Sequence, residues 1–182
     1  MFFDEEMLLD LRLNIMDQYV DKFVITEANY MHNGSSKKLN FNINNFSKFK
    51  DKIIYIPVED PPPGLFDINK DDNHKTKSDK LILNGYMRDN YQREMAHKAL
   101  KDIDNNDWII INDIDEIPNL NKINFRNIDK KLIIFKQKIF YYKFNLLHEN
   151  IDWYGTKACK KKKLKSFEWL KYIKNKKYPF WR

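Results

Sequence analysis

Three carboxylates follow directly on a strongly apolar segment, at a spacing suited to a hard metal ion. The apolar run begins at Trp108 and is followed by Asn112-Asp113-Ile114-Asp115-Glu116-Ile117-Pro118. The β-branched run predicts a buried strand, and the asparagine and proline mark where the chain leaves it. Open α/β sheets bind ligands beyond the carboxyl ends of their strands, so Asp113 and Asp115 could present oxygens to one divalent cation that faces a phosphate. The same Asp-x-Asp pattern also begins ordinary turns, because aspartate caps helices and bends loops.

The chemistry of the ligands favours some metals over others. Carboxylate and phosphate oxygens are hard ligands, which favour Mn²⁺ or Mg²⁺ over zinc. The histidines do not have the spacing of zinc ligands and are scattered along the chain: His32, His74, His97 and His148. Glu116 has two open interpretations, as an acid behind the metal ligands or as a cap of the segment that follows.

The first half of the chain supplies elements typical of an α/β domain. Residues 7–19 predict an opening helix, whose apolar residues at helical spacing are Leu8, Leu11, Ile15 and Tyr19. Short strands follow over residues 20–26, ending at Glu27, and over residues 53–58. The polar segment from the Pro61-Pro62-Pro63-Gly64 break to about Lys80 predicts a mobile loop.

The second half contains the strand that leads to the acids. Residues 89–103 predict a helix that feeds the strand beginning at Trp108. A strand, a helix and a strand in this order predict a right-handed parallel crossover. Residues 132–135 and 139–144 predict two further strands, which we expect to form a later antiparallel pair.

Composition limits the classes of protein to which the chain could belong. The 182 residues suit one domain, and the single cysteine, Cys159, cannot form an internal disulfide. The N-terminus has no basic segment followed by an apolar core, and no apolar run approaches the ~20 residues of a membrane span. We therefore expect a soluble, cytoplasmic protein without a signal peptide or membrane anchor. Of the formal charge of +7, the largest share comes from lysines at residues 157–177, which is typical of a solvated face.

Short motifs in a fixed order from Phe3 to Gly155 resemble those of glycosyltransferase family 17. The first are Phe3-Asp4-Glu5 with Leu8-Leu9-Asp10-Leu11-Arg12-Leu13, and Val20-Asp21-Lys22-Phe23-Val24-Ile25-Thr26-Glu27. The next are Gly34 with Lys37, similar to Thr-Phe-x-Gly-x-x-Lys, and Asn90-Tyr91-Gln92-Arg93, similar to Glu-x-x-Gln-Arg. The last are residues 112–118, similar to Ser-Asp-x-Asp-Glu-Ile-Pro, and Tyr141-Tyr142 with Trp153-Tyr154-Gly155, similar to Tyr-Tyr … Trp-x-Gly.

The resemblance implies a GT-A-like, Rossmann-like single domain with a mixed, mostly parallel sheet. The family's animal members are inverting β-1,4-mannosyl-glycoprotein 4-β-N-acetylglucosaminyltransferases that use a UDP-sugar. By resemblance we expect a glycosyltransferase that moves a sugar, which the family suggests is GlcNAc, onto a glycan, glycolipid or glycoprotein acceptor. Animal members also carry an N-terminal membrane anchor and further C-terminal sequence. We accordingly expect residues 1–156 to be the catalytic domain and residues 157–182 to belong to an incomplete acceptor region.

The site residues follow from this chemistry. A metal stabilises the diphosphate as the glycosidic bond stretches, with Asp115 as the expected direct ligand and Asp113 on the metal or the ribose. Three more residues are expected to bind the nucleotide sugar: Glu27 at uracil or ribose, Lys37 at a phosphate, and Arg93 at the diphosphate. Structural alternatives are a solvated Lys37, and a salt bridge from Arg93 to Glu27 or Asp113. Inversion also needs a general base, which is Glu116, Glu149, Asp152 or a residue outside this sequence.

Three other functions remain open from the sequence alone. A metal-dependent phosphohydrolase also uses clustered aspartates, although such enzymes usually need more ligands than this segment offers. A fragment that binds nucleotide sugars without catalysis is the second alternative. The third is a basic protein that contacts nucleic acid or a membrane surface through Lys160-Lys161-Lys162-Lys163, with nucleic acid the less expected partner.

Overall fold

A computed structural model describes residues 1–143 and 145–176 of the chain. It divides into two units, Met1–Asp102 and Ile103–Arg182, which are described separately below. Phe144, the predicted end of one strand, and the residues from Lys177 to Arg182 lie outside the described residues. Within the described ranges, no helix combines the length and the apolar character needed to cross a bilayer.

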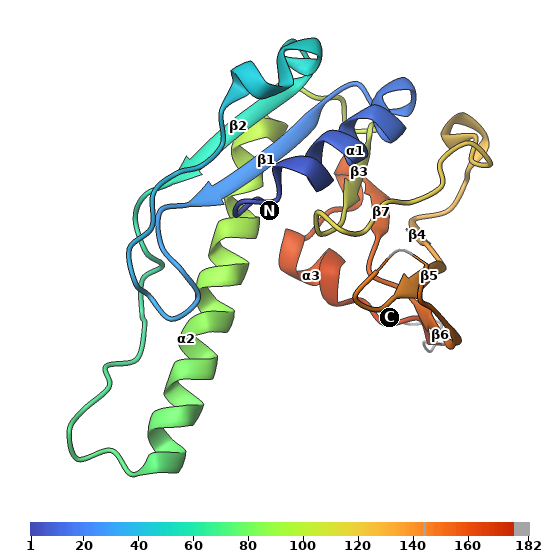
Figure 1. The fold of residues 1–182 in the computed structure, drawn as a ribbon. Coiled ribbons are helices and arrows are strands. Elements are labelled where there is room, and N and C mark those ends of the chain that lie inside the picture. Colours follow the sequence, from blue (N-terminus) through green and yellow to red (C-terminus); the bar gives the residue numbers. More distant parts are fainter. Residues whose placement is uncertain (144, 177–182) are drawn as a thin grey trace. The chain divides into compact units, whose positions relative to one another are not determined.

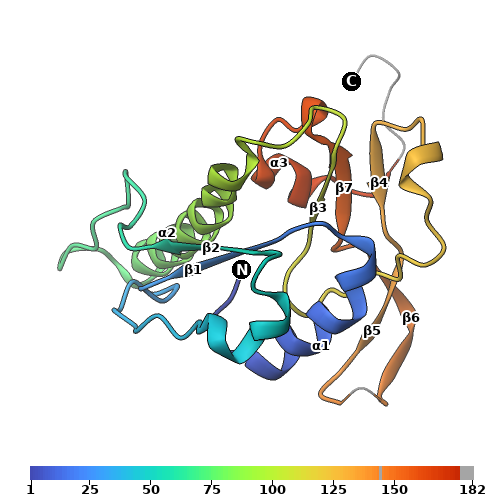
Figure 2. The same ribbon diagram turned by 90° about the horizontal axis from the view of Figure 1, so that it is seen from above.

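The first unit is built on two parallel strands with a helix on each side. Its elements are α1 (Glu6–Met16), β1 (Phe23–Ala28), β2 (Ile53–Val58) and α2 (His74–Glu94), with short 3₁₀ helices η1 (Asp17–Tyr19), η2 (Ile43–Phe49) and η3 (Met95–Leu100). The strands pair in register from Phe23 opposite Ile53 to Ala28 opposite Val58. Figures 1 and 2 show α1 on one face of this pair and α2 on the other. The prediction of an opening helix and of these two strands is confirmed.

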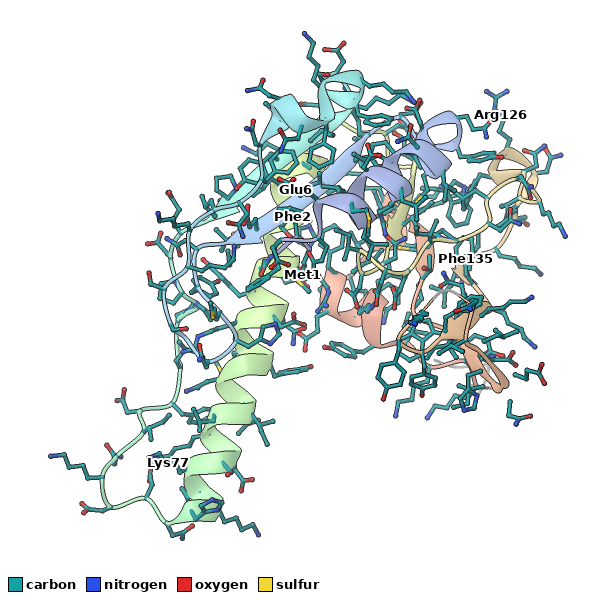
Figure 3. All side chains as sticks on the ribbon, viewed as in Figure 1. Met1, Phe2, Glu6, Lys77, Arg126 and Phe135 are labelled. Carbon is teal, nitrogen blue, oxygen red and sulfur yellow. The ribbon has the colours of Figure 1, made fainter. Side chains whose placement is uncertain are left out.

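The buried face of α1 differs from the predicted one. Leu9, Leu13 and Met16 are buried, whereas Leu11 and Ile15 are exposed. Both sets have helical spacing, so the periodicity in the sequence alone could not decide which stripe faces the strands. Phe2 also belongs to this core: its backbone N–H donates to the Thr26 carbonyl at 2.9 Å, and Figure 3 marks its position beside α1.

Helix α2 begins earlier than the sequence predicts. The Asn73 side chain caps it by accepting a hydrogen bond from the Thr76 N–H at 2.9 Å, and Lys77 in Figure 3 marks its first turns. The prediction of a mobile loop up to residue 80 is therefore wrong for residues 74–80. The preceding segment is also held to the helix, because the buried Asn84 amide exchanges two 2.8 Å hydrogen bonds with the backbone of Phe66.

The described part of the second unit contains antiparallel strands and one short α-helix. Its elements are β3 (Trp108–Ile111), β4 (Leu132–Ile134), β5 (Gln137–Phe140), β6 (Leu147–Trp153), β7 (Lys157–Lys160) and α3 (Phe167–Tyr172), with 3₁₀ helices η4 (Phe125–Asn127) and η5 (Lys161–Lys163). Strand β7 lies between β3 and β4 and pairs antiparallel with both, and β5 pairs antiparallel with β6. Its centre is apolar, because Ala158 and Cys159 are fully buried.

Three predictions about the strands need correction. The sheet is not mostly parallel, since β1–β2 is the one parallel ladder among the described residues. No described ladder joins β3 to β1 or β2, so the predicted crossover does not produce a parallel neighbour for β3. The strands β4 and β5 are present but pair with β7 and β6, respectively, and not with each other. The sequence predicted neither β6 nor β7, whose polar residues hide their strand pattern.

Candidate functional site

The acidic motif follows the carboxyl end of strand β3, as predicted, and there it forms a tight turn. The strand ends at Ile111, and the Glu116 N–H then donates to the Asp113 carbonyl at 3.0 Å. The Glu116 carboxylate folds back to accept from the Asp113 N–H at 2.8 Å, and the Asn112 amide donates to the Glu116 carbonyl at 2.8 Å. These bonds fix the backbone of Asp113 at the start of the turn, and the Glu116 side chain is only 4% exposed.

A lysine that was not predicted from the sequence neutralises this turn. Lys171 in α3 places its ammonium 2.8 Å from Asp113 Oδ2 and 2.8 and 2.9 Å from the two Glu116 oxygens. Its side chain is only 11% exposed. The sequence did contain one indication of this role: Lys171 lies four residues after the buried Phe167, and this spacing places both residues on the same face of a helix. Its partners Glu116 and Asp113 are 55 and 58 residues away from it in the chain, and no local pattern could identify them.

The Trp-x-Gly motif completes the surroundings of Glu116. The Trp153 indole N–H donates to Glu116 Oε1 at 2.9 Å. A Cβ on Gly155 would overlap both the Glu116 carboxylate and the Trp153 indole nitrogen. Glycine is therefore required at this position so that the backbone can approach the carboxylate. The two motifs, although distant in sequence, form one hydrogen-bonded structure.

A cavity of about 430 Å³ opens beside this structure. It is lined by Asp115 and Glu116 from the turn and by side chains of the β5–β6 hairpin: Gln137, Lys138, Ile139, Phe140, Tyr142, Lys143 and Trp153. Its size lies within the range of ligand sites. Of the three carboxylates considered as a general base, Glu116 is in this lining, while Asp152 is paired with Lys136 at 2.8 Å and Glu149 is exposed on β6.

The two aspartates are compatible with a hard divalent cation. The pKa of Asp115 is raised, mainly because neighbouring atoms desolvate it and also because the Glu116 and Asp113 carboxylates repel its charge, whereas Lys171 opposes the shift. A second cation would relieve this repulsion. Among the described residues no three His, Cys, Asp or Glu side chains gather into a metal site. Magnesium, however, commonly takes one or two carboxylates and completes its shell with waters and substrate phosphates, so Asp113 and Asp115 fit such an ion.

Glu27 and Lys37 lie together in the first unit. Glu27 is the penultimate residue of β1 and is fully buried, and Lys37 donates to its Oε1 at 2.6 Å. The Asn40 N–H at 2.7 Å, the Phe41 N–H at 3.0 Å and the Tyr55 hydroxyl at 3.0 Å donate to the same carboxylate. The Glu27–Lys37 ion pair and these hydrogen bonds fasten residues 37–41 to strands β1 and β2. The predicted contacts of Glu27 and Lys37 with a nucleotide sugar stay predictions.

Arg93 is also engaged in the first unit. It donates to Asp89 at 2.9 Å and to Asn90 at 3.1 Å, on its own helix α2. The neighbouring Gln92 amide donates to the Thr26 carbonyl at 2.9 Å, which ties α2 to β1. The helix motif therefore has a structural role, and the predicted contact of Arg93 with a diphosphate stays a prediction.

The lysine run is partly absorbed into the structure. Lys161 donates to the Ile103 carbonyl at 2.7 Å and Lys162 to the Asn106 side chain at 2.6 Å. Lys157 is buried and donates to the carbonyls of Gly155 and Lys171. These lysines hold the second unit together, which weakens the alternative of a basic binding surface.

Comparison with known proteins agrees with the motifs. A family model described as glycosyltransferase family 17 matches residues 1–172. Proteins named β-1,4-mannosyl-glycoprotein 4-β-N-acetylglucosaminyltransferase from Homo sapiens and Rattus norvegicus are each 29% identical over 115 residues, and that from Mus musculus is 28% identical. The matches cover 61% of this chain and only 19% of the length of each relative. No solved structure matches the chain. Because the family model covers nearly all of the sequence, the chain belongs to glycosyltransferase family 17.

Proposed function

We propose that this chain is a metal-dependent, inverting glycosyltransferase that moves a sugar from a UDP-sugar to a glycan or glycoconjugate acceptor. The observation that carries the proposal is the family match, which includes the acidic turn at Asp113–Glu116. The β1–β2 pair between two helices and the carboxylates at the end of β3 support a GT-A-like fold. The name shared by the relatives makes UDP-GlcNAc the first donor to test and a mannosyl glycoprotein the first acceptor.

The residues of the turn would have distinct roles. Asp115 and Asp113 would hold Mn²⁺ or Mg²⁺, which supplies electrostatic stabilisation of the leaving diphosphate when bound. Glu116 fixes the Asp113 backbone and is itself held by Lys171 and Trp153, so we assign it a positioning role. The Lys171 ammonium limits the negative charge of the turn and holds the Asp113 carboxylate through a 2.8 Å ion pair.

Calorimetric titration of UDP and UDP-GlcNAc tests the donor site, with and without Mn²⁺. We expect binding that requires the metal and is abolished by Asp115→Ala, while far-UV circular dichroism shows an unchanged fold. Asp152→Ala is the matched control, because it removes a carboxylate from the same unit that is paired with exposed Lys136. Metal-dependent UDP binding that survives Asp115→Ala would contradict the assignment of the metal ligands.

Product analysis then separates transfer from hydrolysis. With UDP-GlcNAc and a mannosyl acceptor, a transferase yields an elongated glycan whose new linkage is inverted relative to the donor. Formation of UMP and GlcNAc 1-phosphate, at the same rate with and without acceptor, would instead favour a phosphohydrolase, because that class breaks the phosphoanhydride bond and leaves the glycosidic bond intact. Metal-dependent binding of UDP-GlcNAc without turnover, in the presence of acceptors, would favour the noncatalytic binding fragment.

A further inference from the structure

The β5–β6 hairpin exposes several aromatic side chains close to the acidic turn. Phe140, Tyr141 and Trp153 are each about half exposed, and Tyr142 is 98% exposed. Large apolar side chains grouped on one surface mark a place where something binds, since their exposure has a cost in water. Phe140, Tyr142 and Trp153 also line the cavity that contains Asp115.

The backbone of Tyr142 supports a role in binding. Its φ angle is +58°, and among the described residues it is the one non-glycine residue with a positive φ. This left-handed conformation is unfavourable for a residue with a Cβ and is commonly retained at functional sites. Packing of the Tyr142 side chain does not offset the cost of this backbone conformation, because the side chain is almost wholly exposed to solvent. A ligand that covers the ring would provide the compensation.

The polar lining of the cavity indicates the chemical class of this ligand. Asp115 supplies hydrogen-bond acceptors, and Gln137, Lys138 and Lys143 supply donors. Acids and lysines are both present, so the lining suits a neutral molecule with many hydroxyl groups better than an anion. A pyranose ring has such hydroxyl groups around its edge and an apolar C–H face that can lie on an aromatic ring.

We propose that this cavity binds one pyranose ring of the acceptor, with its C–H face against Tyr142 and its hydroxyl groups toward Asp115. The inference rests on the proposed function, because it takes the sugar in the cavity to be the acceptor of the transfer. It adds a location for the acceptor within the second unit and names the β5–β6 hairpin as the element that recognises it. Trp153 connects the two functions, since its ring lines the cavity while its N–H holds Glu116.

Saccharide binding to the full chain, measured without UDP or metal, tests the inference. The probes are the methyl glycosides of mannose, N-acetylglucosamine, galactose and glucose, titrated while the resonances of labelled tyrosines are followed by NMR. We expect at least one glycoside to shift the Tyr142 resonance. We also expect Tyr142→Ala to weaken its binding about tenfold, which corresponds to the loss of one aromatic contact. Tyr142→Trp keeps an aromatic face and should retain binding.

Tyr86→Ala is the control, because Tyr86 is a half-exposed tyrosine on α2 in the other unit. Its dissociation constant for the glycoside should equal that of the unsubstituted chain. Equal effects of the two alanine substitutions, or no glycoside binding either alone or with UDP and Mn²⁺, would overturn the inference. A Tyr142 resonance that responds to UDP and to none of the glycosides would also overturn it, because the ring would then contact the nucleotide. Binding of UDP that depends on Asp115 is measured separately, so failure of the saccharide site leaves the donor site standing.

Discussion

Replacing Lys171 by methionine should strongly destabilise the second unit. The ammonium makes three contacts of 2.8–2.9 Å with two carboxylates, and one of these, Glu116, is 4% exposed. Methionine keeps the apolar length of the side chain and removes the charge. The Glu116 carboxylate would then be buried without its cation, and breaking a buried pair in this way costs about 3–5 kcal/mol. With a urea m value of about 2 kcal/mol per molar, the unfolding midpoint should fall by about 1.5–2.5 M.

Tryptophan fluorescence in a urea titration is the appropriate assay. Every tryptophan of the chain lies in the sequence of the second unit: Trp108, Trp153, Trp169 and Trp181. The signal therefore follows the unit that contains Lys171. Lys136→Met is the matched control, because Lys136 forms a 2.8 Å ion pair with Asp152 in the same unit, with side chains 66% and 47% exposed. An exposed pair contributes at most about 1 kcal/mol.

A second substitution checks the physical cause. In the double variant Lys171→Met with Glu116→Gln, the buried group that lost its cation is neutral, so part of the stability should return. We expect a coupling free energy of about 1–3 kcal/mol between the two positions. The reasoning is refuted if Lys171→Met and Lys136→Met shift the midpoint equally, or if the two substitutions at the turn are simply additive.

Four further predictions concern other parts of the chain. Glu27→Gln should lower the free energy of unfolding by about 3 kcal/mol, measured by circular dichroism, because a buried lysine loses its counter-ion. Gly155→Ala should cost about 1–3 kcal/mol through overlap with a buried carboxylate, and an unchanged urea midpoint would disprove this. Burial raises the pKa of the Cys159 thiol to about 11, so alkylation at about pH 8 should be slow in the native chain and fast in guanidinium chloride. Hydrogen bonds from Lys80 and the Asn69 N–H lower the pKa of Asp72. The contribution of these bonds to folding stability is therefore present above the ordinary aspartate pKa and is lost as pH falls through the lowered Asp72 pKa. In the variant Lys80→Met, NMR titration should show a higher Asp72 pKa.

Local patterns predicted the elements that have a strong apolar period. The runs at β1, β2 and β3 are rich in β-branched residues, and all three form strands. The acids at the end of β3 were placed correctly for the same reason. The polar start of α2 was missed because its helix depends on the Asn73 cap and on Asn84, and neither contributes to an apolar stripe. Strand β7 was missed because lysines flank its two buried central residues.

The site could be predicted only in part, because its partners are brought together by the fold. Asp113 and Glu116 share a four-residue motif, and their spacing was sufficient to select them. Lys171 contacts both from a helix far along the chain, and spacing carries no information about such a contact. The same limit applies to Glu27: its place at a strand end was predicted, but its four donors come from a loop and a second strand.

The position of β7 has a consequence for how the second unit is made. Strands β3 and β4 both take their hydrogen bonds from β7, which is the last of the three to be synthesised. Until Lys160 has left the ribosome, β3 and β4 are edges without a partner and can pair with another nascent chain. A chain stopped before Lys157 should therefore aggregate, whereas one stopped after α3 has all three strands. Folding of the acidic turn thus waits for the C-terminal part of the chain, which supplies both the central strand and Lys171.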